Sequence, residues 1–180
     1  MTEFPPLEEF GRRIMVCGPS NAGKSTLAAA LGRTLGSPVV HLDQLHHLPG
    51  SNWVPRPRED FVALHNDAIA GEQWVMDGNY TGLFPARLSR ATGIIVIRSN
   101  RFGGVARYFR RTLFERGRVG SLSGNRDSIK WQMIHWIMFA APPKQRAMRR
   151  ALPSAGLPYL EVHAMRQLNR LYREWGLSRG

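Results

Sequence analysis

Cysteine, lysine and acidic residues are all scarce in this chain of 180 residues. The single cysteine excludes an internal disulfide and favours a reducing compartment, so we expect a cytoplasmic protein. Residues 1–10 are acidic and contain proline, and they lack the basic and apolar regions of a signal peptide. No apolar run reaches the ~20 residues that span a bilayer, so we expect no membrane partner.

The shortage of acidic residues leaves a net charge of +12. Such a charge predicts an anionic partner, either a nucleic acid or a nucleotide together with a second anionic substrate. A solvated basic face without a specific partner is the alternative. Arginine carries most of the charge, and its planar fork suits phosphate. Seven arginines fall in one segment: Arg101, Arg107, Arg110, Arg111, Arg116, Arg118 and Arg126.

The composition is that of a globular protein, with 43% hydrophobic and 21% charged residues. A chain of this length can bury most of its apolar surface in one core. No internal repeat and no linker divides it. We therefore expect residues 1–180 to form a single domain.

One motif organises the chain: Gly18 to Thr26 matches G-x-x-x-x-G-K-[ST], the phosphate-binding loop. Residues 12–17 end in an apolar run, which predicts a buried strand before the loop, and leucines every four positions predict a helix after it, to about Leu35. The glycines let backbone N–H groups approach phosphate oxygens, Lys24 can reach the β- and γ-phosphates, and Ser25 can bind Mg²⁺. The predicted nucleotide-binding residues are Gly18, Pro19, Ser20, Asn21, Ala22, Gly23, Lys24, Ser25 and Thr26.

Strand and helix patterns alternate along the rest of the chain, which predicts a parallel sheet covered on both faces. We expect further strands over 38–42, 73–76, 93–97 and 157–162, and further helices over 59–70, 82–90, 102–116, 128–141 and 164–175. Residues 1–11 are expected to form a loose arm, and 45–58 and 117–125 to be loops. The helix over 128–141 is apolar almost all round and is expected to end at Pro142-Pro143. We favour a core helix packed on the sheet over a dimer interface.

Two aspartates follow predicted strands at the edge where ligands bind in such sheets. Asp77 is the candidate to hold Mg²⁺ together with Ser25, although Asp77-Gly78-Asn79 is also a good turn sequence. Asp43 can act as a base or orient an acceptor hydroxyl, or it can cap the next helix. Trp53 and Tyr80 can wall a substrate pocket or serve packing alone.

The arginines of 101–126 suit a lid that neutralises the transferred phosphoryl group. Arg107 and Arg111 are our first choices. A basic helix that contacts DNA is the weaker alternative, because no nucleic-acid-binding motif is present. The predicted catalytic residues are thus Lys24, Asp43, Arg107 and Arg111.

The strings His41-Leu42-Asp43 and Asp77-Gly78-Asn79-Tyr80, with the phosphate loop, resemble those of the adenylate-kinase-related proteins labelled topology modulation protein. The resemblance covers nearly the whole chain. It implies a three-layer α/β P-loop fold like that of nucleoside monophosphate kinases, with a five-stranded parallel sheet in the order 2-3-1-4-5. It further implies ATP and Mg²⁺ as cofactors, a lid at about 101–127, and adenine near 163–165. Adenylate kinases carry Asp-Gly-Phe-Pro-Arg where this chain has Asp77-Gly78-Asn79-Tyr80, so AMP is not implied as the acceptor.

The sequence therefore predicts a kinase that transfers the γ-phosphoryl group of Mg-ATP to a small acceptor, which is a nucleotide, a nucleoside or another metabolite. The alternatives are a nucleotide-dependent nucleic-acid-binding protein and an ATPase without an acceptor. The predicted substrate-binding residues are Asp43, Trp53, Gly78, Asn79 and Tyr80.

Overall fold

Five strands form one sheet in this computed structural model, which describes residues 4–51, 53–114 and 131–179. The order is β2-β3-β1-β4-β5, and every neighbouring pair is parallel. This confirms the predicted α/β fold and its strand order. The strands are β1 (Arg13–Cys17), β2 (Val39–His41), β3 (Trp74–Asp77), β4 (Gly93–Arg98) and β5 (Tyr159–His163).

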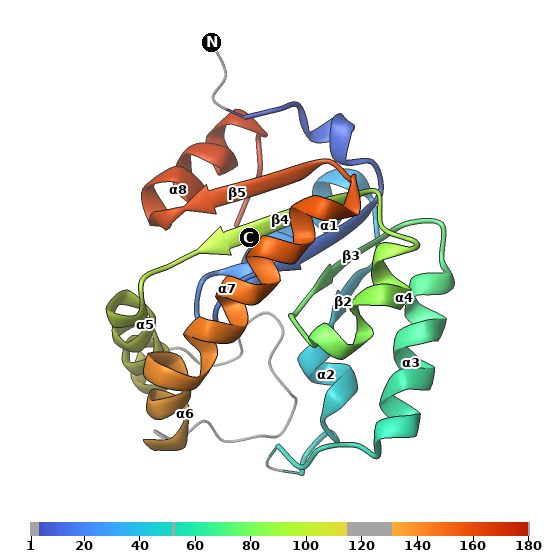
Figure 1. Cartoon of the computed structure of the whole chain (residues 1–180). Coiled ribbons are helices and arrows are strands. Elements are labelled where there is room, and N and C mark those ends of the chain that lie inside the picture. The colour runs from blue at the N-terminus through green and yellow to red at the C-terminus, as the bar shows by residue number, and fades with distance from the viewer. Residues whose placement is uncertain (1–3, 52, 115–130, 180) are drawn as a thin grey trace.

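Helices connect the strands and cover both faces of the sheet (Figure 1). The α-helices are α1 (Lys24–Leu35), α2 (Leu42–His46), α3 (Arg58–Ala70), α4 (Phe84–Leu88), α5 (Arg101–Phe114), α6 (Trp131–His135), α7 (Ala141–Ala151) and α8 (Ala164–Glu174). Short 3-10 turns lie at Leu7–Phe10, Thr81–Leu83 and Leu152–Ala155, and Trp136–Ala140 is π-helical. Among the described residues, no helix has the length and apolar content needed to cross a bilayer.

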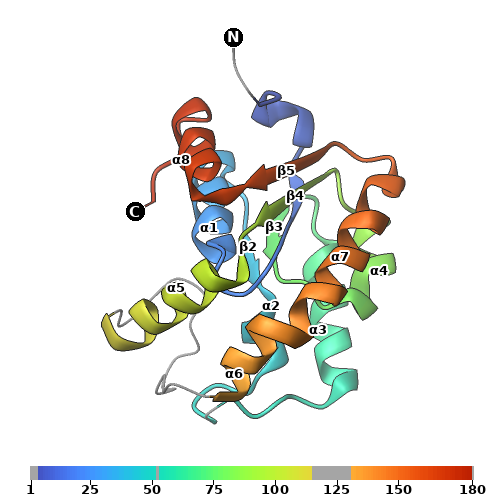
Figure 2. The same cartoon turned by 60° about the vertical axis from the view of Figure 1, so that its left-hand side comes forward.

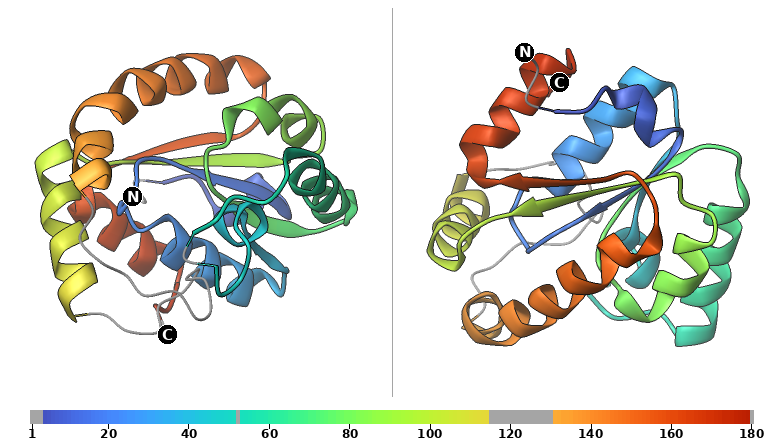
Figure 3. Two further views of the ribbon diagram at one scale, coloured as in Figure 1. Left: turned by 90° about the horizontal axis from the view of Figure 1, so that it is seen from below. Right: turned by 45° about the horizontal axis from the view of Figure 1, so that its top comes forward.

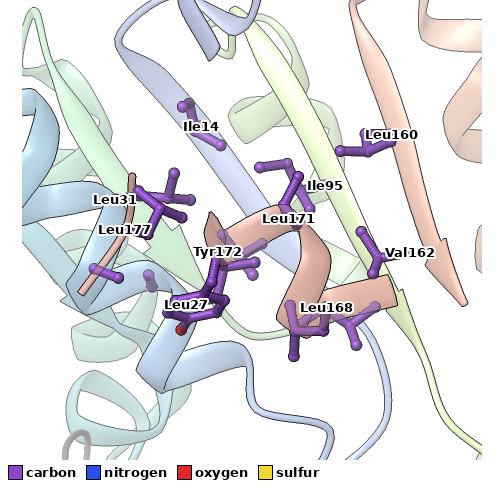
Figure 4. Packing of buried hydrophobic residues seen from close by; sticks show 14 of the residues in the cluster. Ile14, Leu27, Leu31, Ile95, Leu160, Val162, Leu168, Leu171, Tyr172 and Leu177 are labelled. Atoms are coloured by element: carbon purple, nitrogen blue, oxygen red, sulfur yellow. The ribbon is translucent and has the colours of Figure 1, made fainter. Parts of the chain in front are cut away.

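The helices form two layers. Helices α1 and α8 pack on one face of the sheet, and α3, α4 and α7 pack on the other (Figures 2 and 3). On the first face, Leu27 of α1 and Leu171 of α8 meet Ile14 and Ile95 of the central strands (Figure 4). Strands covered on both faces read as continuous apolar runs, which is why β1, β3 and β4 are buried along almost their whole length.

The strand register brings three strand ends together. Asp77, the last residue of β3, lies opposite His41 of β2 and opposite Val16 of β1. Because the strands are parallel, the loops that follow β1, β2 and β3 all leave from this one edge of the sheet.

Residues 4–11 of the N-terminal arm are not loose, which corrects the prediction for this part of 1–11, and residues 1–3 lie outside the described chain. Residues 7–10 form a 3-10 turn, and Phe4, Leu7 and Phe10 are buried. The ring of Phe10 lies 5.5 Å from that of Trp175, whose indole N–H donates to the carbonyl of Pro5 (3.0 Å). Phe4, Leu7 and Phe10 are three residues apart, so they lie on one face of the turn and pack toward α8; this spacing is too short to stand out as a helix in the sequence.

The prediction that Pro142-Pro143 ends a core helix is also wrong. The two prolines lie in the first turn of α7, where the missing N–H groups need no partner, so the chain stays helical to residue 151. The preceding segment does not pack as a core helix, because Trp131 is 81% and Phe139 is 62% exposed. It lies beside α5, where Ile137 contacts Gly104. Residues 128–130 lie outside the described chain.

Two further expectations are corrected or left open. The predicted strand 38–42 ends at His41, so Asp43 lies in the first turn of α2 and the predicted loop 45–58 begins inside a helix. Of the predicted lid, the structure describes 101–114, which form α5; the predicted loop 117–125 lies outside the described residues.

Candidate nucleotide-binding site

The loop between β1 and α1 has the shape that its glycines allow. Gly18 has φ +139°, and a Cβ there would lie 2.3 Å from the carbonyl oxygen of Ile97. Gly23 has φ +92° and precedes the first residue of α1, Lys24. The Lys24 ammonium donates to the carbonyl of Pro19 (2.9 Å), so it folds back over the loop. The loop is thus a narrow backbone cradle at a helix N-terminus, an arrangement that suits phosphate.

Ser25 and Asp77 meet directly below this cradle. The Ser25 hydroxyl donates to Oδ2 of Asp77 (2.6 Å), and Nδ1 of His41 pairs with Oδ1 (2.6 Å). Asp77 is only 5% exposed, and each of its two carboxylate oxygens has a hydrogen-bond partner, Ser25 or His41. A hydroxyl and a carboxylate are hard oxygen donors, so this pair fits the chemistry of a Mg²⁺ site. The described residues contain no group of three or more His, Cys, Asp or Glu side chains that could hold a metal, so protein ligands to Mg²⁺ here would be limited to this pair.

Asn79 ties the loop after β3 to the phosphate loop. Its amide oxygen accepts from the N–H of Gly18 (3.0 Å), and its amide nitrogen donates to the carbonyl of the same residue (2.9 Å). The side chain therefore pairs with one glycine as a neighbouring strand would. The preceding residue, Gly78, has φ +125° and lies against Leu42, so a side chain there would meet the Cβ of Leu42 at 2.9 Å.

A buried arginine holds this same loop from behind, and the sequence analysis did not identify it. Arg87 of α4 is 0% exposed and donates to the carbonyls of Gly78 (2.9 Å), Asn79 (2.5 Å) and Tyr80 (3.0 Å). Its guanidinium also lies 4.8 Å from the centre of the Phe84 ring. Burial lowers the pKa of Arg87 to about 10, so the group is still charged at neutral pH. The only sequence signal was an arginine among the apolar residues of a short helix.

Asp43 lies at the rim of the site, held by Tyr80. The Tyr80 hydroxyl donates to Oδ1 of Asp43 (2.7 Å), and Asp43 itself is exposed. Burial and the Asp43 carboxylate both raise the pKa of Tyr80, so the phenol is a permanent donor near neutral pH. The Tyr80 ring lies 5.0 Å from His46 and 5.1 Å from Phe61, forming an aromatic wall beside the carboxylate. Burial, aided by His47, lowers the pKa of His46, which favours its neutral form.

Helix α5 reaches the phosphate loop through Arg107. Its Nε donates to the carbonyl of Asn21 (2.6 Å), and its terminal nitrogen donates to Ser99 Oγ. Partial burial lowers the pKa of Arg107. The side chain of Arg111 lies outside the described part of the chain. The ring of Trp53 contacts His47, with 5.3 Å between the two ring centres.

Cys17, at the end of β1, has no reactive character. It is 0% exposed, and burial raises the pKa of its thiol to about 11. A neutral buried thiol acts as a small apolar side chain that fills space in the core.

Comparison with a solved shikimate kinase supports the fold of this chain. No known family profile matches the chain. Shikimate kinase from Acinetobacter baumannii, solved with shikimate, superposes with a TM-score of 0.53 at 15% identity, over 94% of this chain and 96% of that one. A gluconokinase from Sinorhizobium meliloti gives 0.44 at 17% identity, over 79% and 99%. The chain has a P-loop kinase-like fold.

One curated relative is similar in sequence. The chain is 27% identical over 172 residues to the tRNA dimethylallyltransferase of Syntrophobacter fumaroxidans. The match covers 87% of this chain and 44% of the relative, so the chain spans less than half the length of that protein.

Proposed function

We propose that this chain is an ATP-dependent kinase that transfers the γ-phosphoryl group of Mg-ATP to a hydroxyl of a small acceptor. The observation that supports it most is the contact of Ser25 with Asp77 (2.6 Å) at the foot of the phosphate loop. A second carboxylate, Asp43, is held by Tyr80 at the same sheet edge. A cradle for phosphates and a carboxylate for an acceptor are the two parts that phosphoryl transfer requires.

In this proposal each residue of the site has one role in binding the nucleotide or the metal. Lys24 and the loop N–H groups bind the β- and γ-phosphates. Ser25 and Asp77 would hold Mg²⁺, which when bound neutralises phosphate charge. His41 keeps the Asp77 carboxylate in place. Arg107, already on the loop, is placed to move toward charge that develops on the transferred group.

The transfer itself needs one proton acceptor. The acceptor oxygen forms a bond to the γ-phosphorus while the bond from that phosphorus to the bridging oxygen breaks, and ADP leaves with the electron pair. The hydroxyl proton goes to Asp43, whose Oδ1 is held by Tyr80 while Oδ2 remains for the acceptor. The aromatic wall of His46, Phe61 and Tyr80 favours an acceptor with a flat or apolar face.

A screen for stimulated ADP formation tests this function. Nucleosides, nucleotides, sugars and small hydroxy acids would be supplied one at a time with Mg-ATP. We expect at least one class to raise ADP formation well above the rate without an acceptor. Phosphate released to water at an unchanged rate with every compound would instead indicate an ATPase.

Replacing Asp43 by asparagine is expected to lower kcat by about 10²–10⁴-fold, because the amide cannot take the proton. The affinity for ATP should stay the same, since Asp43 contacts the acceptor side. Steady-state kinetics of acceptor-stimulated ADP formation measure both. Asp67→Asn, on the exposed face of α3, removes the same charge elsewhere and should leave kcat unchanged. Equal kcat values for wild type and Asp43→Asn would remove Asp43 from the mechanism.

Replacing Asn79 by aspartate is expected to weaken ATP binding about tenfold. The new carboxylate cannot donate to the carbonyl of Gly18, and the lost bond with its unpaired partner costs roughly 1–3 kcal/mol. Isothermal titration with Mg-ATP measures the change, and Asn66→Asp on α3 is the control. Unaltered ATP affinity in Asn79→Asp would show that the loop holds its shape without this pair.

A nucleic-acid substrate is the second candidate function. The net charge of +12 favours a polyanion, and the curated relative is named as acting on tRNA. Binding to tRNA that falls steeply with salt, without any acceptor-stimulated ADP formation, would favour this candidate.

A further inference from the structure

An open hollow with a basic lining lies on the outer side of α8. It has a volume of about 540 Å³, within the range of small-ligand sites. None of its lining residues belongs to the phosphate loop, and we call it the α8 pocket. Its lining residues are Arg166, Asn169, Tyr172, Arg173, Leu177 and Arg179.

The end of α8 builds the wall of this pocket. Gly176 takes a left-handed conformation (φ +60°), and its N–H donates to the carbonyl of Arg173 (3.3 Å). The N–H of Leu177 donates to the carbonyl of Tyr172 (2.8 Å), which completes a Schellman motif. The motif turns the chain back and buries Leu177. The pocket therefore lies between the helix and a returning segment that has fixed hydrogen bonds.

The helix contributes one polar face to the pocket. Arg166, Asn169 and Arg173 are three and four residues apart, so they share one side of α8, and all three are exposed. Leu168 and Leu171 on the opposite side are buried against the sheet. The guanidinium groups are thus held apart from the core and directed to solvent.

The returning segment adds a third guanidinium in a fixed position. Arg179 donates to Oδ1 of Asn169, and its guanidinium lies 4.6 Å from the centre of the Tyr172 ring. Arg33 of α1 donates to the carbonyl of Ser178 (2.6 Å) and adds a further positive charge nearby. Burial raises the pKa of Tyr172, whereas Arg179 and Arg33 lower it, so both charges act on this ring.

None of the described residues that line the pocket is acidic. The acidic residue of α8, Glu174, pairs with Arg170 (2.8 Å) instead. Three guanidinium groups around one open hollow, without a carboxylate among its described lining residues, attract a ligand that carries several negative charges. Arginine forks bind phosphate oxygens in two-point geometry, which favours phosphate over other anions.

The same geometry argues against recognition of a base. The Tyr172 ring is only 6% exposed and is covered by Arg179, so it offers no face for stacking. We propose that the α8 pocket is a second phosphate-binding site, separate from the phosphate loop, which takes a run of adjacent phosphates from a free triphosphate or from an RNA backbone.

A pair of matched double variants tests the proposal. Arg166→Gln/Arg173→Gln removes two charges from the pocket, and Arg146→Gln/Arg150→Gln removes two exposed charges from α7, across the sheet. The probe is a fluorescein-labelled single-stranded RNA 12-mer followed by anisotropy at several salt concentrations. The pocket variant should bind about tenfold more weakly and lose about 1.4 from the salt slope, while the α7 variant should change far less.

Competition separates the two sources of phosphate. Inorganic triphosphate that displaces the RNA at micromolar concentration identifies a free polyphosphate. If triphosphate displaces the RNA only at concentrations where sulfate of equal ionic strength displaces it equally, the effect is that of salt alone. The phosphates that the pocket binds are then those of the RNA backbone. If the double variant melts below wild type, Arg173→Gln alone should still lose about 0.7 from the slope. Absence of binding by wild type, or equal losses in both double variants, overturns the proposal.

Discussion

Replacing Lys24 by alanine is expected to lower acceptor-stimulated ADP formation by about 10²–10³-fold or more. The Lys24 ammonium stands over the phosphate loop, 2.9 Å from the carbonyl of Pro19, and is the cation best placed to stabilise charge on the β- and γ-phosphates. Loss of a single preorganised donor of this kind typically has an effect of that size. The fold should not change, because the side chain makes its contact within the loop alone. A coupled assay of ADP measures the rate, and thermal unfolding measures the fold.

A second lysine provides the control. Lys144→Ala removes the same group from the exposed surface of α7 and should retain the wild-type rate. Turnover by Lys24→Ala within tenfold of wild type would contradict phosphate binding by this residue, and with it the proposed kinase.

Replacing Arg87 by methionine is expected to have the largest effect on stability. Methionine fills much of the space, but the buried carbonyl of Gly78 and the partly buried carbonyls of Asn79 and Tyr80 lose their donor. Breaking such a buried charged network typically costs about 3–5 kcal/mol of unfolding free energy. For a chain of this length that corresponds to a fall in Tm on the order of 10 °C. Thermal and urea unfolding followed by circular dichroism measure it.

Arg90 provides the matched control for Arg87. It is also an arginine that donates to backbone carbonyls, those of Ile69 and Ala70, but its side chain is 41% exposed. Water can replace it there, so Arg90→Met should cost no more than about 1 kcal/mol. Equal unfolding curves for Arg87→Met and Arg90→Met would show that the buried arginine contributes no more to the free energy of unfolding than the exposed one.

The ATP affinity of Arg87→Met adds a functional test of the same loop. If Arg87 sets the position of Asn79, the variant that still folds should also bind ATP more weakly, as Asn79→Asp does. A variant that loses stability but keeps full ATP affinity would separate the scaffold role of Arg87 from the shape of the phosphate loop.

Much of the fold was predictable from local signals. The residues from Gly18 to Thr26 are contiguous, so their motif can be recognised without any knowledge of the fold. The structure places Gly18 to Gly23 between β1 and α1 and the last three residues of the motif in the first turn of α1, as expected. Leu27 and Leu31 are four residues apart, which is enough to predict the buried side of α1. The alternation of such helices with apolar strands fixes a parallel sheet covered on both faces.

The errors arose where a local signal was ambiguous. Two adjacent prolines stop a helix in its interior but begin one in its first turn, and the sequence alone does not say which applies at Pro142. The apolar run before them was assigned to the core by composition, although its Trp131 and Phe139 are exposed. Composition cannot distinguish a core helix from a partly exposed one, because burial depends on which other elements pack against the segment.

The sequence by itself determined the phosphate loop and the layered α/β fold, because both depend on spacings within a few residues. Only the tertiary structure decided that Asn79 pairs with Gly18, 61 residues earlier, and that His41 lies opposite Asp77. It also decided that Arg87, rather than one of the many exposed arginines, is buried behind the loop after β3. These contacts depend on strand order and on the rotation of α4, and those are set by the packing of the whole core.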